Sequence, residues 1–215
     1  MKNKRIISFL LISMCICGFI CWIFWTQEIQ YALPTPVPAQ FVDVKMGEHV
    51  DLNDQLKINN NKPALLHFFN ASCPCSRFNM QEFESMAHRY KKDIRFYVVL
   101  QSEDEDAVTK FKKKYELDLP VILDKSGMIS DKCGIYSTPQ AVILDKHSSI
   151  YFKGNYNASR YCTRRETRFV EMAIDSLVAN RPLPIALKNM LTEPYGCTLP
   201  SDEVSQSNNL VFNLF

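Results

Sequence analysis

The sequence predicts one α/β domain, a three-layer α/β/α sandwich around a central mixed sheet, preceded by one N-terminal transmembrane helix. Three observations lead to this prediction. Short apolar runs typical of buried strands alternate with longer segments whose apolar residues recur at helical spacing. The last two apolar runs flank a short polar turn, which favours an antiparallel hairpin at one edge of the sheet. A separate apolar run of roughly 20 residues, long enough to cross a bilayer, begins near the N-terminus.

That first run, residues 6–25, reads IISFLLISMCICGFICWIFW. Lys2, Lys4 and Arg5 precede it, and the next basic residue is Lys45. Because positively charged flanks stay in the cytoplasm, residues 1–5 are expected to form a cytoplasmic basic stub and the rest of the chain to be exported. A cleaved signal peptide is the alternative. It requires small residues at A-x-A spacing, which the following FWTQEIQYALP lacks, so an uncleaved anchor is favoured.

Length and charge limit what the exported part can be. The 215 residues suffice for one domain of roughly 100–150 residues with appendages, but not for two. The whole chain has 25 basic and 23 acidic residues. Residues 1–25 hold three of the basic residues and none of the acidic ones, which leaves 22 basic and 23 acidic residues and a net charge of −1. This balance argues against a nucleic-acid partner.

The exported part divides by composition into three segments. Residues 26–40 carry prolines at alternate positions and are expected to form a stiff linker. Residues 41–180 hold the patterned elements of the domain. Residues 181–215 contain further prolines and end in a weakly patterned tail, so an irregular C-terminal extension is expected.

Each element of the domain is predicted from its local pattern. The run 63–69, PALLHFF, is continuously apolar and reads as a central buried strand. Apolar side chains recur at helical spacing in the segment that follows it. Lysines gather toward the end of the next predicted helix, where the helix dipole favours them. In chain order, the expected elements are strand 63–69, helix 74–91, strand 94–100, helix 103–115, strand 120–124, a short helix ending at Cys133, strands 140–145 and 149–152, and helix 166–179.

Two cysteines lie where the central strand turns into the first helix of the domain. Cys73 and Cys75 stand in the sequence HFFNASCPCSRFN, directly after the strand. The unpaired N–H groups and the dipole at a helix N-terminus stabilise an anion, so a thiolate at Cys73 is favoured there. Pro74 suits the first helical turn, and Arg77 would add a positive charge one turn on. This pattern predicts that Cys73 acts as a nucleophile.

A second motif precedes the strand AVILD. Pro139 follows Thr138 at the entry to that strand, where a proline is tolerated. The Thr138–Pro139 bond is a candidate for the cis form, which is almost confined to bonds that precede proline. A loop of this kind facing Cys73 would expose backbone groups that can pair with an extended substrate segment. We therefore expect Thr138 and Pro139 to bind substrate.

These motifs and the order of elements resemble the thioredoxin superfamily. The stretch ELDLPVILDKSGMISDKCGIYSTPQAVILDKHSSIYFKGNY is similar, more narrowly, to the membrane-anchored, extracytoplasmic TlpA/ResA-type thiol–disulfide oxidoreductases of bacteria. The resemblance covers roughly residues 40–180. It implies a thioredoxin-like fold, a single-pass protein of the bacterial inner membrane with its C-terminal domain in the periplasm, and protein thiols or disulfides as partners. A redox partner in the membrane is also implied, and no cofactor.

The chain departs from this family at the second cysteine of the Cys-x-x-Cys motif. Ser76 stands at that position, and Cys75 is an additional thiol between the two. Cys73 then matches the attacking cysteine. A direct Cys73–Cys75 disulfide would close a small, strained ring and would therefore be readily reduced and oxidising. Alternatively, a mixed disulfide at Cys73 could be resolved by Cys75, by Cys133, by another protein or by a small thiol.

The remaining exported cysteines leave alternatives open. The exported part has five cysteines, an odd number that cannot all pair within one chain. Cys133 is either a resolving thiol or a buried core residue. Cys162 and Cys197 both lie in the C-terminal part and are candidates for a structural disulfide. The histidines show no zinc-site spacing with the cysteines, so no metal ligand is predicted.

The favoured hypothesis is a membrane-tethered thiol–disulfide oxidoreductase, whose redox direction the sequence leaves open. Cys73 and Cys75 could instead hold Cu(I) through their thiolates, as in a copper chaperone. A peroxidase is a third hypothesis, weakened by Asn70 at the position where that chemistry needs threonine. A thioredoxin-like adaptor without catalytic activity is the fourth.

Overall fold

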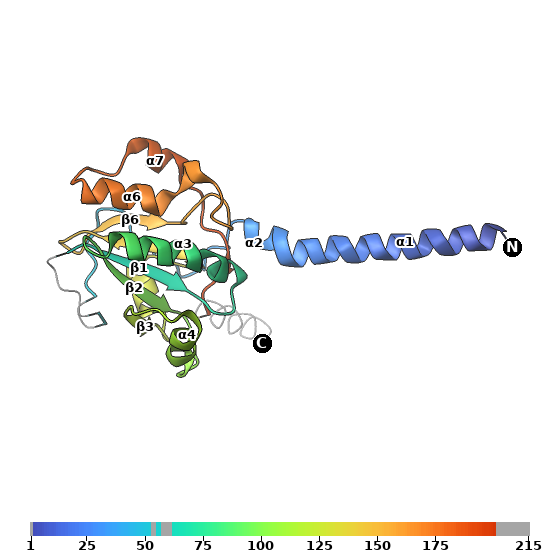
Figure 1. The fold of residues 1–215 in the computed structure, drawn as a ribbon, viewed down its shortest axis with the longest axis horizontal. Coiled ribbons are helices and arrows are strands. Elements are labelled where there is room, and N and C mark those ends of the chain that lie inside the picture. The colour runs from blue at the N-terminus through green and yellow to red at the C-terminus, as the bar shows by residue number, and fades with distance from the viewer. Residues whose placement is uncertain (1, 53–54, 57–61, 201–215) are drawn as a thin grey trace.

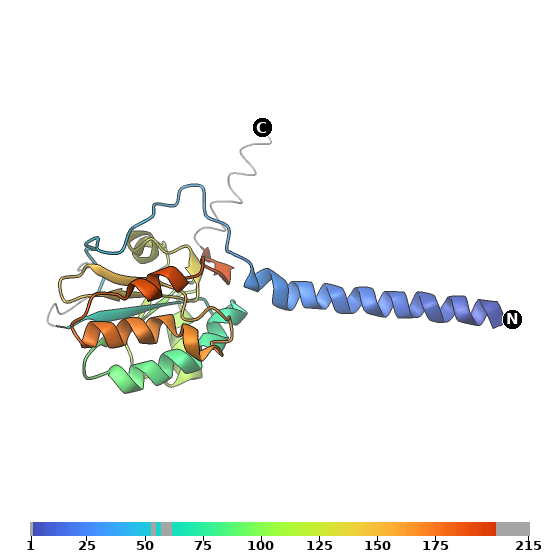
Figure 2. The same ribbon diagram turned by 90° about the horizontal axis from the view of Figure 1, so that it is seen from above.

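The computed structural model describes residues 2–52, 55–56 and 62–200 of the chain. A domain of helices around a sheet lies at one end of a long N-terminal helix (Figure 1). The second view shows residues 33–50 running along the side of the domain opposite the helix α3, Pro74–Tyr90 (Figure 2).

The sheet fixes the position of every other element. In the described part of the chain it has five strands in the order β3-β2-β1-β5-β6. The first three of these are parallel to one another, whereas β5 is antiparallel to β1 and β6 is antiparallel to β5. This arrangement confirms the predicted mixed sheet with an antiparallel edge. The strands span β1 Ala64–Phe69, β2 Arg95–Leu100, β3 Val121–Leu123, β5 Gln140–Leu144 and β6 Ile150–Gly154.

Helices cover both faces of this sheet, which confirms the predicted three layers. On one side lie α3 and α6 (Phe169–Val178), and on the other lie α5 (Met128–Cys133) and residues 44–52. Helix α4 (Ala107–Tyr115) lies beside β3 (Figures 1 and 2). The predicted helix 103–115 begins later than expected, because Asp104 accepts hydrogen bonds in a turn that precedes it. Helix α6 is preceded by a 3₁₀ turn at Arg165–Thr167.

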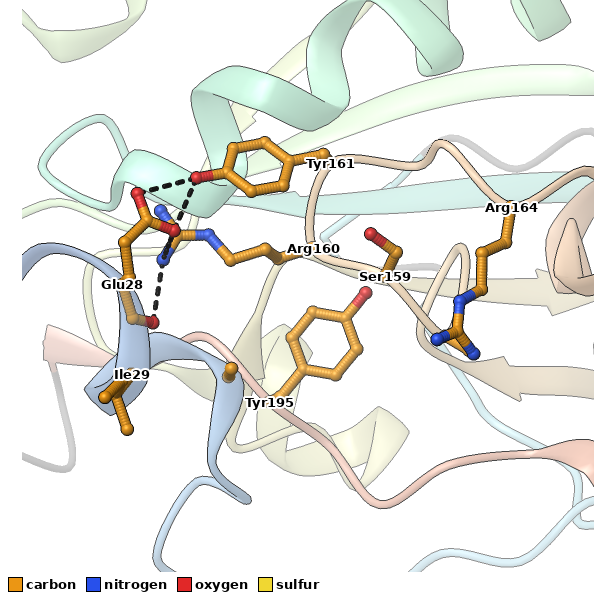
Figure 3. Close-up of a pocket in the computed structure, with 9 residues that line it drawn as sticks. Glu28, Ile29, Ser159, Arg160, Tyr161, Arg164 and Tyr195 are labelled. Carbon is orange, nitrogen blue, oxygen red and sulfur yellow. Dashed lines mark hydrogen bonds and ion pairs between the residues drawn. The ribbon is translucent and has the colours of Figure 1, made fainter. Parts of the chain in front are cut away.

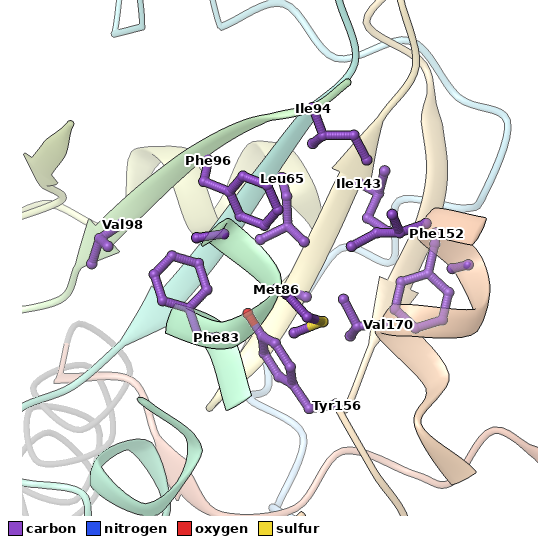
Figure 4. Close-up of a cluster of buried hydrophobic side chains, with 14 of the residues drawn as sticks. Leu65, Phe83, Met86, Ile94, Phe96, Val98, Ile143, Phe152, Tyr156 and Val170 are labelled. Carbon is purple, nitrogen blue, oxygen red and sulfur yellow. The ribbon is translucent and has the colours of Figure 1, made fainter. Parts of the chain in front are cut away.

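Two hydrophobic clusters hold the layers together. Side chains of β1 alternate between them, as the pleat of a strand requires. Leu65 and Phe69 join α3 and α6 in the first cluster, part of which is drawn in Figure 4. Leu66 and Phe68 point to the second cluster, which includes Ile129 of α5. The central strand is therefore buried along its whole length.

The N-terminal helix extends further than the predicted span. Helix α1 covers Lys2–Phe24, a π-helical turn covers Trp25–Ile29 and α2 covers Gln30–Ala32, so that 29 residues from Lys4 to Ala32 are helical and apolar enough to cross a membrane. The first part of the predicted linker is thus helical. The chain becomes extended at Leu33, because the following Pro34 disfavours helical geometry at the residue before it.

In its described part, residues 181–200, the C-terminal extension contains regular elements where irregular structure was expected. It forms helix α7, Ile185–Met190, and the short strand β7, Cys197–Thr198. Leu187 of α7 is fully buried against the first cluster, which provides the apolar contact that the helix needs. The remaining part of the predicted extension, 201–215, lies outside the described residues.

One histidine is buried in the core without a charged partner. His67 of β1 stacks on Phe83 of α3 with ring centroids 4.4 Å apart. Its Nδ1 atom is 2.7 Å from the Tyr156 hydroxyl, with which it shares a hydrogen bond. Burial lowers the pKa of His67 from the ordinary 6.5 to about 3. The imidazole is therefore neutral in the folded protein at neutral pH.

This burial predicts an acid-sensitive contribution to stability. Because the folded pKa lies below the unfolded one, the unfolded chain takes up a proton first as the pH falls from 6.5 toward 3. We expect His67 to reduce the free energy of unfolding by about 2 kcal/mol between about pH 7.5 and about pH 5. The measurement is urea unfolding of the detergent-solubilised chain, compared with a His67→Phe/Tyr156→Phe variant that lacks both hydrogen-bonding groups. Equal pH dependence of the two proteins would contradict this assignment.

Candidate active site

Cys73 is joined by a disulfide to Cys197, a residue 124 positions further along the chain. Their Cα atoms are 6.0 Å apart. Cys73 is extended and lies immediately before the first residue of α3, so its sulfur is at the helix N-terminus, as the sequence predicted. Cys197 begins β7. The C-terminal extension thus reaches back to the first helix of the domain.

Backbone pairing holds Cys197 in this position. Strand β7 runs antiparallel to β4, Ser137–Thr138, in a two-stranded sheet, with Thr138 opposite Cys197. The Thr138–Pro139 bond is cis, which confirms the prediction from the sequence. The sulfur of Cys73 lies 3.6 Å from the carbonyl oxygen of Thr138. The structure therefore brings together the two motifs that the sequence singled out, Cys73 and Thr138–Pro139.

A glycine allows this close pairing. Gly196 has φ of +120°, a conformation that side-chain-bearing residues rarely adopt. A Cβ atom at this position would overlap the carbonyl oxygen of Thr138 and lie 3.1 Å from its carbonyl carbon. Only glycine lets the backbone before Cys197 approach Thr138 so closely.

The segment 194–198 is also held from its other side, by the residues that follow the N-terminal helix. The Thr35 N–H donates to the Pro194 carbonyl over 2.8 Å, and Pro34 forms an antiparallel bridge with Tyr195. The hydroxyls of Thr35 and Ser137 share a hydrogen bond of 2.7 Å. Ser137 in turn donates to the Tyr195 carbonyl over 3.1 Å. The C-terminal segment therefore lies between the linker and the cis-proline loop.

The other residues of the Cys-Pro-Cys-Ser motif point elsewhere. Cys75 is a free, fully buried thiol, and it forms no bond with Cys73. Ser76 is also fully buried, and its hydroxyl accepts a long hydrogen bond of 3.4 Å from the Asn70 N–H. Arg77 is exposed and donates to the Ala71 carbonyl over 3.2 Å. The Arg77 guanidinium, expected to add a positive charge near Cys73, thus binds a backbone carbonyl that precedes the motif.

The candidate disulfide between Cys162 and Cys197 is not formed. Cys197 is bonded to Cys73, and Cys162 is a free thiol that accepts a hydrogen bond of 3.1 Å from the Asn79 side-chain amide. The pairing of β7 with β4 fixes this outcome, because it directs Cys197 to the cis-proline loop. Burial raises the pKa of Cys162 to about 11.

Cys133 lies in the second hydrophobic cluster, fully buried at the end of α5. Burial, reinforced by the charge of Asp124, raises its pKa to about 12. Of the two alternatives that the sequence left open, this position fits the buried core thiol.

A buried arginine, Arg160, which the sequence analysis overlooked, lies beside the C-terminal end of the N-terminal helix (Figure 3). The guanidinium of Arg160 donates to the carbonyls of Gln27 and Glu28, and it forms an ion pair of 3.5 Å with the Glu28 carboxylate. The Tyr161 hydroxyl donates to the same carboxylate over 2.6 Å. These contacts attach the end of the long helix to the loop after β6. They line a cavity of about 350 Å³ that Tyr195 also borders.

The charge of Arg160 also affects a thiol of the motif. Burial raises the pKa of Cys75, while Arg160 and a backbone hydrogen bond partly oppose this effect and Glu28 adds to it. The thiol is therefore kept protonated mainly by its desolvation. Arg160 is far in the sequence from α3, so no local pattern around it could predict that it lies near this helix.

The disulfide itself can be approached from solvent. A second cavity, of about 460 Å³, is bordered by both cysteines of the bond, by Gly196 and by linker residues including Thr35. Cys73 is only 1% exposed, whereas Cys197 is partly exposed, so this cavity offers an approach to the bond from the side of Cys197. The arrangement is suited to thiol–disulfide exchange, in which an incoming thiolate must approach one sulfur along the S–S axis.

Comparisons with known proteins agree with this geometry. Residues 43–198 match the family described as "Domain of unknown function (DUF6436)". The thiol–disulfide oxidoreductase ResA of Bacillus thuringiensis is 26% identical over 156 residues, which covers 70% of this chain and 87% of that protein. The sporulation thiol–disulfide oxidoreductase A of Bacillus subtilis is 24% identical over 154 residues, covering 70% and 88%.

Solved structures share the fold. A hypothetical protein from Sinorhizobium meliloti aligns with a TM-score of 0.61 and 15% identity over 74% of this chain and 96% of that chain. An uncharacterized conserved protein from Geobacillus kaustophilus aligns with a TM-score of 0.58 and 19% identity over 78% and 97%. The match over residues 43–198 shows that the chain belongs to the DUF6436 family. Its oxidoreductase relatives, together with the mixed sheet and the cis-proline beside a helix-terminal cysteine, make it a TlpA/ResA-like member of the thioredoxin superfamily.

Proposed function

We propose that this protein is a membrane-tethered thiol–disulfide oxidoreductase whose redox couple is the pair Cys73 and Cys197. The observation that carries the proposal is the bond between Cys73, at the N-terminus of α3, and Cys197, opposite Thr138. The oxidoreductases among its relatives support the reaction class. Ser76 stands where those enzymes have their second cysteine by resemblance, and Cys197 supplies the missing sulfur from another part of the chain.

The reaction proceeds in two exchanges. In the reduced protein, the Cys73 thiolate attacks one sulfur of a target disulfide, and the other target sulfur leaves as a thiolate. The Cys197 thiolate then attacks Cys73, which forms the Cys73–Cys197 bond and releases the second target thiol. Two electrons pass from the protein to the target. In the opposite direction, a target dithiol reduces the Cys73–Cys197 bond by the same steps in reverse.

The environments of the other thiols support these roles. Cys133 and Cys162 have pKa values raised by burial to about 12 and about 11, and so are protonated at neutral pH. The Cys75 pKa is also raised by burial. A protonated thiol is a poor nucleophile, so Cys197, which the fold can bring to the Cys73 sulfur, is the better resolving residue. Thr138 and Pro139 serve to position the target backbone.

The proposal places the domain outside the cytoplasm, where disulfides persist. The helix Lys4–Ala32 is long and apolar enough to serve as a single-pass anchor in a bacterial inner membrane. Lys2, Lys4 and Arg5 would keep its N-terminus in the cytoplasm and the domain in the periplasm. Protein thiols or disulfides in that compartment are then the targets, and a membrane protein with a redox-active dithiol would restore the starting state.

The two sulfurs of the proposed couple should give different phenotypes. We expect Cys73→Ser to lower turnover of a protein disulfide by roughly 100-fold or more, because the attacking sulfur is lost. Cys197→Ser should retain the first exchange and accumulate mixed disulfides between Cys73 and target proteins, detected on non-reducing gels. Cys133→Ala is the matched control, since this thiol lies in the core. The assignment fails if Cys197→Ser turns over normally without trapped complexes.

Reporter fusions test the proposed topology. Alkaline phosphatase joined to the C-terminus of the chain should be active, because it folds only after export, whereas β-galactosidase at the same place should be inactive. The reason is the basic stub at residues 2–5, which precedes the apolar helix. The opposite pattern of reporter activity would place the domain in the cytoplasm and exclude the proposed periplasmic role.

A further inference from the structure

We propose that residues 194–199 are an internal substrate mimic, so that the preferred targets are extended peptides with an aromatic residue and a glycine directly before the reactive cysteine. This inference rests on the proposed function and names the substrate class of the same site. It is carried by the way the segment is held: one edge pairs with the cis-proline loop, and its cysteine is already bonded to Cys73.

The segment meets the geometric requirements of a target in a mixed disulfide. Such a target must bring a sulfur to Cys73 and satisfy its backbone groups at the adjacent edge. Cys197 brings its sulfur to Cys73. The backbone of Cys197 and Thr198 pairs with that of Thr138 and Ser137 and so satisfies its hydrogen-bonding groups at this edge. A target peptide in the same register would form the same contacts. The segment would leave as the target enters, and it would displace the target backbone when Cys197 returns to attack Cys73.

The glycine requirement follows from the carbonyl of Thr138. A Cβ atom at position 196 would overlap that oxygen, and the φ of +120° disfavours any side chain there. The obstacle is backbone that belongs to the cis-proline loop rather than a flexible side chain. Any peptide that places its cysteine opposite Thr138 would therefore meet it at the preceding residue.

The side chains on either side of Gly196 and Cys197 are also buried in specific contacts with the domain. Tyr195, two positions before the cysteine, is 8% exposed, and its hydroxyl donates to the Asn157 carbonyl over 2.6 Å. Leu199, two positions after the cysteine, is 1% exposed and belongs to the second hydrophobic cluster. These contacts extend the preferred pattern to aromatic–glycine–cysteine–any residue–aliphatic.

The test uses two thiol-activated peptides and the full chain in detergent. In Cys197→Ala protein, the internal segment can no longer bond to Cys73. The peptides PYGCTL and PYACTL, each carrying a 2-thiopyridyl group on cysteine, react with Cys73 and release a coloured pyridinethione. A Cys73→Ser/Cys197→Ala protein gives the background from the other thiols. Dipyridyl disulfide, which has no peptide backbone, measures the intrinsic reactivity of Cys73.

We expect the glycine peptide to react at least about 10-fold faster than the alanine peptide, the scale of a backbone forced into an unfavourable conformation. Equal rates for the two peptides, with Cys73 still reactive toward dipyridyl disulfide, would overturn this inference and leave the proposed function standing. A Cys73 that reacts with none of the three reagents would overturn the proposed function, and the inference with it.

The same requirement can be tested within the chain. Gly196→Ala should lower the equilibrium ratio of the Cys73–Cys197 disulfide to the dithiol, measured in glutathione buffers, by about 10-fold or more. Gly47→Ala is the matched control, since Gly47 also has a positive φ, of +96°, but nothing lies within 4 Å of its added Cβ. This ratio should change less than about twofold in the control. Equal shifts in the two variants would show that the contact with Thr138 does not govern docking.

Discussion

The antiparallel pairing of Cys197 and Thr198 with the cis-proline loop is the interaction on which the proposed site depends. It sets the register that places Cys197 on the sulfur of Cys73 rather than near Cys162. The pairing requires close contact between two backbones, and Gly196 supplies the space for it. Without this pairing, Cys73 would lose the sulfur to which it is bonded, because Ser76 occupies the place of the usual partner and Cys75 is a buried free thiol.

The fold brings the partners of this pairing to one end of the sheet. Cys73 follows the end of β1, the central strand, and the cis-proline loop immediately precedes β5, which lies beside β1. The third participant is the linker, whose Thr35 bonds both the C-terminal segment and Ser137. Glu28 and Arg160 join the end of the N-terminal helix to the same region. The N-terminal helix therefore contacts the part of the domain where we propose that the chemistry takes place.

Local patterns in the sequence were sufficient to predict the fold class, the strands and helices of the domain, and the cis form at Pro139. These features depend on periodicity, on turn residues and on the special backbone of proline, all of which are read within a few residues. The pairing of Cys73 with Cys197 spans 124 positions and depends on a β7 strand that is only two residues long. No periodicity is visible in so short a strand.

Dependence on distant contacts also explains why the sequence predicted neither the position of Arg160 nor helix α7. Arg160 is defined by its contacts with Glu28 and Gln27, more than a hundred positions away. Helix α7 is short and flanked by prolines, and its order comes from burying Leu187 in the first cluster. The glycine before Cys197 was the one local signal of a close backbone approach, but it has meaning only once Thr138 is seen opposite.

The most direct measurement of the central claim is a redox titration of the full chain, in its native membrane, with differential alkylation of all cysteines and mass spectrometry of each. The account predicts that Cys73 and Cys197 change from disulfide to thiol together, as one two-electron couple, while Cys75, Cys133 and Cys162 remain thiols throughout. A bond between Cys73 and Cys75, or between Cys162 and Cys197, as the species that titrates would contradict it.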